Sequence, residues 1–179
     1  MKSLFTLAAL FALAVPAAFA APPASPGASA APPSSGPTPS QLCREQLRVM
    51  GAASFISTYA PGGNGRSALG RCISRQAALA SSNQTNAAKE CKKERGTTSA
   101  SIAAFNATYG TNENDRNAYG KCVSKKAREL NAAQQDATLN AAKTCKAERA
   151  SIGAVAFKNK YGTNPSKSNA FGKCIQKNK

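Results

Sequence analysis

Apolar residues recur at steps of three and four along two long segments, 73–90 and 123–144, that contain no glycine or proline. Such steps keep residues on one face of a helix and predict a long helix near 67–95 and another near 117–150. The faces form thin, alanine-rich heptad seams of the coiled-coil type, which favour packing but leave open whether the helices form a hairpin or a rod. The seam positions are Ile73, Ala77, Ala80, Gln84, Ala87 and Cys91, then Val123, Ala127, Leu130, Gln134, Ala137 and Ala141.

A motif bounded by two cysteines occurs three times, at about 43–72, 91–122 and 145–174. Each copy has a phenylalanine, a tyrosine four residues later and a cysteine thirteen residues after the tyrosine. That cysteine ends the run SALGRC, NAYGKC or NAFGKC. Periodicity of this kind predicts an array of similar structural units. The aromatic pairs are Phe55/Tyr59, Phe105/Tyr109 and Phe157/Tyr161.

Helix ends are marked by capping residues. Ser67, Asn117 and Asn169 share one repeat position and are expected to be N-caps. Gly110 and Gly162 follow the repeat tyrosines and are expected to be left-handed C-caps. The segment from Thr38 to Gln41 fits a capping box with proline at the first helical position, which predicts where the first helix starts.

All six cysteines are expected to form disulfides within the copies. A helix over 72–91 would hold its ends roughly 28 Å apart, which no disulfide spans. Because every aromatic residue after residue 20 lies between paired cysteines, each loop is expected to be its own mini-core, with the long helices as spacers. Such a core is too small to be stable alone, and closing a ~30-residue loop contributes ~3–4 kcal/mol. The expected pairs are Cys43–Cys72, Cys91–Cys122 and Cys145–Cys174.

Residues 1–20 have the layout of a secretory signal peptide, with one cation, an apolar stretch and Ala18-Phe19-Ala20 before the cleavage point. A membrane anchor is disfavoured because the apolar stretch is short and is broken by Pro16. Residues 21–40 are rich in Pro, Ala and Ser without charge and are expected to form a disordered linker. The helical repeat region is then 41–179. The fold class is all-α, with three disulfide-stapled units joined by two long helices.

The chain is strongly basic, with 24 Lys and Arg residues against 8 Asp and Glu and a net charge of +16. In each copy a Lys or Arg directly follows the first cysteine, and another directly precedes the second cysteine. Three clusters on a spaced scaffold are expected to bind a polyanion such as an anionic envelope polymer multivalently. The alternative is that these are ordinary solvated helix-face residues. The candidate residues are Arg44, Arg71, Lys92, Lys121, Lys146 and Lys173.

Catalytic and metal chemistry have little support. The chain has no histidine and no C-x-x-C pair, so a zinc site lacks its ligands and a catalytic thiol lacks its base. Glu113 and Asp115 share a loop in the second copy alone, where a solvated turn is a better explanation than an acid pair. We therefore expect no enzyme, no cofactor, no metal, no small-molecule substrate and no membrane span after signal cleavage.

At YGTN followed by NAFGKC the chain resembles uncharacterised secreted bacterial proteins with similar cysteine-bounded repeats, over about 40–179. The resemblance implies an exported repeat protein and no activity, ligand or site. The function expected from the sequence is a secreted, periplasmic or envelope-associated interaction or structural protein at or outside the bacterial envelope, binding polyanions. The alternative is a soluble cationic factor that binds nucleic acid or acts on membranes.

Overall fold

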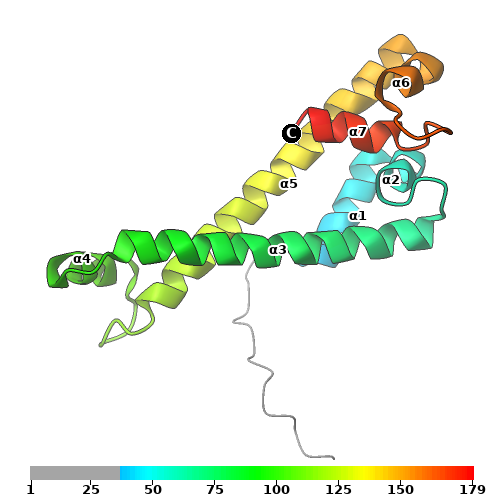
Figure 1. The fold of residues 1–179 in the computed structure, drawn as a ribbon. Helices are drawn as coiled ribbons and strands as arrows, with labels where there is room; N and C mark the ends of the chain where they lie inside the picture. The colour runs from blue at the N-terminus through cyan, green and yellow to red at the C-terminus, as the bar shows by residue number, and fades with distance from the viewer. Residues whose placement is uncertain (1–36) are drawn as a thin grey trace, which may run out of the picture. The chain divides into compact units, whose positions relative to one another are not determined.

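A computed structural model describes residues 37–179; the expected signal peptide and the linker up to residue 36 lie outside the described residues. The described range contains seven α-helices and no strand, which confirms the all-α fold class (Figure 1). The helices are α1 (Pro39–Met50), α2 (Ala52–Tyr59), α3 (Gly65–Arg95), α4 (Ser99–Tyr109), α5 (Ala118–Ile152), α6 (Ala154–Tyr161) and α7 (Ala170–Lys177).

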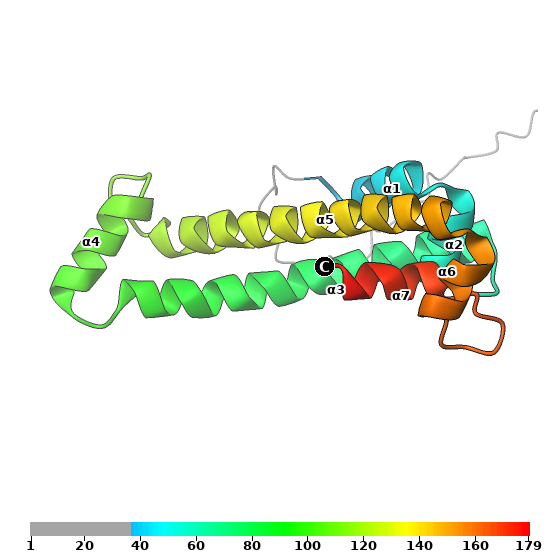
Figure 2. The same ribbon diagram turned by 90° about the horizontal axis from the view of Figure 1, so that it is seen from above.

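The two long helices form a hairpin, which settles the question that the sequence left open. Helix α3 leads through α4 into α5, and α5 runs back across α3 (Figures 1 and 2). Part of their contact is polar: the Asn83 side chain donates hydrogen bonds to Asn131 Oδ1 at 2.7 Å and to Gln134 Oε1 at 3.2 Å. Away from α4 the long helices diverge, and α1, α2 and α7 pack against them there.

The predicted seam is correct on α5 and partly wrong on α3. All six α5 positions are at least half-buried, whereas Ala77 and Gln84 of α3 are exposed and Gln76 and Asn83 take their places. The reason is that α3 packs against α1 and α2 as well as α5, so its buried face turns along its length. A strict heptad describes contact with one partner helix only.

The first and third units share a single core, contrary to the expected three separate mini-cores. Sixteen buried residues form one cluster that includes Phe55 of the first unit and Phe157 of the third. The second unit has a cluster of its own with four buried residues, of which Phe105 is the largest. The hairpin causes this difference, because it returns the end of α5 to the start of α3. The two units then pool apolar surface that neither could bury alone.

The first helix starts as predicted, and the other predicted caps are only partly right. Thr38 accepts from the backbone N–H of Gln41, whose side chain accepts from the Thr38 backbone, so the capping box is confirmed. The N-cap of α3 is Asn64 and not Ser67, whose N–H donates to the Asn64 side chain at 3.0 Å. Asn117 and Asn169 occupy the N-cap positions, but neither side chain makes a capping hydrogen bond.

Those two asparagines instead close the preceding loops. Asn117 accepts from the Thr111 N–H at 3.1 Å, and Asn169 does the same with Thr163 at 3.1 Å. The glycines before these loops are extended and not left-handed as predicted, with φ of −65° at Gly110. Glycine is needed there for space, because a Cβ on Gly110 would lie 2.6 Å from the backbone carbonyl oxygen of Asn106. The positive φ of 52° belongs to Asp115 of the loop.

Candidate functional site

The three disulfides pair as the sequence predicted. Cys43–Cys72, Cys91–Cys122 and Cys145–Cys174 join Cα atoms 5.9, 6.0 and 6.0 Å apart. All six cysteines have no exposed surface. Each bridge therefore ties the helix that enters a unit to the helix that leaves it, and it fixes the side chains that flank it.

A second link in each unit was missed in the sequence, and it joins the first helix of the unit to its middle helix. In every unit the repeat tyrosine donates its hydroxyl to the side chain three residues after the first cysteine: Tyr59 to Gln46, Tyr109 to Glu94 and Tyr161 to Glu148. Residues three apart lie on the same helix face, so the acceptor and the cysteine point toward the tyrosine together. The detectable signal was the recurrence of a Glu or Gln three residues after each first cysteine.

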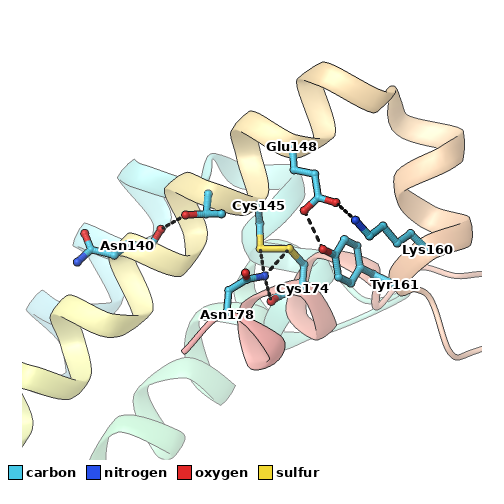
Figure 3. Close-up of a disulfide and its surroundings, with 8 residues drawn as sticks. Asn140, Cys145, Glu148, Lys160, Tyr161, Cys174 and Asn178 are labelled. Carbon is cyan, nitrogen blue, oxygen red and sulfur yellow. Dashed lines mark hydrogen bonds and ion pairs between the residues drawn. A yellow bond between two sulfur atoms is a disulfide. The ribbon is translucent and has the colours of Figure 1, made fainter.

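In the third unit this link includes a lysine (Figure 3). Glu148 accepts from the Tyr161 hydroxyl at 2.7 Å and from Lys160 Nζ at 2.6 Å. The Lys160 ammonium and then the Tyr161 hydroxyl lower the pKa of Glu148. On the other side of the bridge, the Asn178 side chain donates to the Cys174 carbonyl at 2.9 Å. The unit is thus held at its tyrosine as well as by its disulfide, and Asn178 caps the end of α7.

In the second unit Glu94, like Glu148 in the third, accepts from the repeat tyrosine and pairs with a lysine. The Tyr109 hydroxyl lies 2.7 Å from Glu94 Oε1, and Lys126 Nζ lies 3.1 Å from Glu94 Oε2. Tyr109 first and Lys126 second lower the pKa of Glu94, and the hydrogen bond that the Tyr109 hydroxyl donates to Glu94 raises the pKa of Tyr109. The first unit has the neutral Gln46 instead, and there burial raises the pKa of Tyr59. These groups are engaged with one another, as expected for residues that hold a unit together.

The six candidate cations all lie on the surface, and no ion pair within residues 37–179 involves any of them. Each is one residue from a bridge, and consecutive Cα atoms are ~3.8 Å apart, so the two cations of a unit have Cα atoms within ~14 Å of each other. Because the first and third units share a core, four of these cations lie at one end of the hairpin. The other two lie at the second unit.

The total charge is distributed still more unevenly. We call residues 37–75 with 143–179 the shared end, and residues 76–142 the distal part. The shared end has fourteen Lys and Arg residues and two acids, whereas the distal part has nine Lys and Arg residues and six acids. The cations of the shared end are Arg44, Arg48, Arg66, Arg71, Arg75, Lys143, Lys146, Arg149, Lys158, Lys160, Lys167, Lys173, Lys177 and Lys179.

Both acids of the shared end are paired with cations. Glu45 is bonded to Arg48 at 2.6 Å, and Glu148 is bonded to Lys160 at 2.6 Å. Every other cation of the shared end has no acid partner among the described residues. The shared end is thus a surface from which most positive charge projects into solvent.

Metal-ligating groups and membrane-spanning helices are two further features that would bear on function among the described residues. No group of three acids or cysteines within 37–179 is placed to hold a metal ion, and no helix of that range is long and apolar enough to cross a membrane. Asp115 belongs to a turn, where its N–H donates to the Asn112 carbonyl at 3.0 Å.

Comparison of the chain with protein-family models, with curated proteins and with solved structures finds no match. The candidate site therefore depends on the geometry and charge of this chain alone.

Proposed function

We propose that this protein is an exported, non-enzymatic binding protein that holds anionic polymers at or outside the bacterial envelope through the shared end. The observation that carries the proposal is the charge of that end, which has fourteen cations and only two acids, both of them paired with cations. Three disulfides are typical of proteins in an oxidising compartment, which supports action outside the cytoplasm.

Polymer binding suits this surface better than binding of a small anion. The cations are spread over several helices and exposed, so a polymer can contact many of them at once while each contact stays weak and screened. Two disulfides and a common core hold those helices together, so little ordering is needed on binding. Release of counterions from the polymer would then drive association and make it strongly dependent on salt.

The aromatic residues favour recognition of backbone charge over stacking with bases. At the shared end Phe55, Phe157 and Phe171 are at most 3% exposed, and the exposed Tyr119 lies in the distal part. Proteins that grip single-stranded nucleic acid combine a basic groove with accessible aromatic rings on which bases stack. We therefore place anionic envelope polymers ahead of nucleic acid as the ligand, and treat nucleic acid and anionic membranes as arms of the test.

The experiment compares two variants with equal loss of charge. The shared-end variant replaces Arg44, Arg71, Lys146 and Lys173 with Gln. The distal control replaces Lys89, Lys92, Lys121 and Lys125 with Gln. All eight residues are exposed and outside the observed ion pairs, so both variants are expected to fold.

Salt elution from a heparin column is the first measurement, followed by titration with an anionic envelope polymer, single-stranded DNA and anionic vesicles. The shared-end variant should elute at much lower salt than the wild type. The distal control should elute at nearly the same salt as the wild type. On single-stranded DNA, loss of four contacts would reduce the slope of log affinity against log salt by about 3. No retention of the wild type at low salt, or equal losses in both variants, would contradict the proposal.

A further inference from the structure

The third unit docks on the first by a close approach between α7 and α2. A Cβ added to Gly172 of α7 would lie 3.1 Å from the Cα of Thr58 in α2, so the helices touch backbone to backbone there. Next to this contact, the Ser57 hydroxyl donates to the Ser168 carbonyl. Phe171, beside the glycine, is 2% exposed. The chain thus shows how one repeat unit packs against another.

The second unit has the same two surfaces, and nothing in the described chain covers them. Gly120 of α5 is the repeat equivalent of Gly172, and a Cβ there would have no neighbour within 4 Å. Thr108 of α4 is the equivalent of Thr58 and is exposed. A glycine inside a helix costs up to ~1 kcal/mol relative to alanine, and at Gly120 no contact within the described residues explains that cost.

Neighbouring side chains make these surfaces apolar. Tyr119, the equivalent of Phe171, is 37% exposed. Helix α4 has no charged residue, and four of its alanines are exposed: Ala100, Ala103, Ala104 and Ala107. Figures 1 and 2 show α4 at the end of the hairpin away from α1, α2, α6 and α7, so within residues 37–179 only α3 and α5 contact it.

We propose that the second unit docks on the second unit of another copy of this chain, with α4 of one copy against the Tyr119–Gly120 turn of α5 in the other. The docking repeats between chains the contact that α2 and α7 make within one chain. The two surfaces differ, so the contact either closes a dimer or continues from copy to copy.

Charge favours this end of the molecule for self-association. The distal part has nine cations and six acids, whereas the shared end has fourteen cations and two acids. Two copies that met through their shared ends would repel each other strongly, because each shared end has a net charge of +12, whereas each distal part has a net charge of only +3. Association through the second unit also leaves the shared end of each copy open.

The test is sedimentation equilibrium of the purified, oxidised protein without polyanion, at salt high enough to screen surface charge. The wild type should show an average mass that rises with concentration. Thr108→Lys should keep the protein monomeric, and the third unit already has Lys160 at this position, so the unit tolerates lysine. Gly120→Leu should do the same by blocking close approach.

Gly70→Leu is the matched control. Gly70 holds the same repeat position in the first unit and is equally open, so its substitution should leave self-association unchanged. A wild type that stays monomeric at every concentration would overturn the proposal, and so would association that survives both second-unit variants or is lost in Gly70→Leu. Heparin elution should be unaffected by Thr108→Lys beyond its single added charge, so polymer binding and self-association can fail independently.

Discussion

Removal of the Cys91–Cys122 bridge should release α4 while the rest of the fold persists. In the chain-entropy model, loops of 29 and 31 residues predict nearly the same loss, about 3.6 kcal/mol, for any of the three disulfides. The cores are not equal, however. The second unit buries four residues, and Phe105 is the only large one.

The magnitudes explain why α4 depends on its bridge. Burying one phenylalanine contributes about 1.5–3 kcal/mol. Helix α4 has only 11 residues, and isolated helices of that length are marginal in water. Without the ~3.6 kcal/mol of the bridge, little remains to keep α4 docked. By contrast, α7 buries Phe171 and Ile175 in the sixteen-residue core and should stay docked when Cys145–Cys174 is removed.

Native-state hydrogen exchange read by mass spectrometry distinguishes the two cases. In Cys91→Ala/Cys122→Ala, amides of 99–109 should exchange almost freely, while amides of 130–145 remain protected. In Cys145→Ala/Cys174→Ala, amides of 170–177 should keep measurable protection although global stability falls. If 99–109 stays protected in the first variant, or 170–177 loses protection to the same degree in the second, the reasoning from core size is wrong.

Four further substitutions have definite expected outcomes. Gly172→Ala should lower the free energy of unfolding by about 1–2 kcal/mol, because the added Cβ meets the backbone of α2. Gly120→Ala should raise it by up to about 1 kcal/mol, because the added Cβ enters open space. Urea unfolding at low protein concentration measures both. Tyr59→Phe should cost about 1–3 kcal/mol, because it leaves the fully buried Gln46 without its donor, and a thermal melt close to wild type would contradict this. The pKa of Glu94 is lowered in the fold, so the stability it contributes is present above about pH 4.5 and is lost as pH falls through its folded pKa; Glu94→Gln should flatten that acid limb in pH-dependent unfolding.

The sequence was sufficient for the features that depend on short stretches of chain. Helical periodicity located the long helices to within two residues, at Gly65–Arg95 and Ala118–Ile152 against the predicted 67–95 and 117–150. It also narrowed the disulfide pairs, because a rigid helix keeps Cys72 from Cys91, and pairing within each copy was the simplest choice that remained. The flanking cations could be identified as exposed for the same reason, since residues next to a buried cysteine point away from it on a helix.

The hydrogen bonds of the repeat tyrosines were visible in the sequence as a pattern but could not be assigned from it. The acceptors Gln46, Glu94 and Glu148 recur at a fixed distance from their cysteines, so the pattern was present in the chain. It could not be assigned, however, because one acceptor is neutral and a Glu on a helix is usually a solvated residue. The side chain of Asn117 was misassigned for a similar reason: its residue type suits a cap, but the Thr111 backbone offers it a competing hydrogen bond.

Only the tertiary structure decided how the units meet. Thin alanine seams specify a packing face weakly, so the hairpin depends also on α1, which contacts both long helices, on α2 against α3 and on α7 against α5. Once the hairpin forms, the first and third units share one core, their cations gather at one end, and the second unit is left by itself. These consequences involve residues more than a hundred positions apart, such as Ser57 and Ser168, which are 111 positions apart. Local periodicity carries no information about which distant surfaces will be buried together.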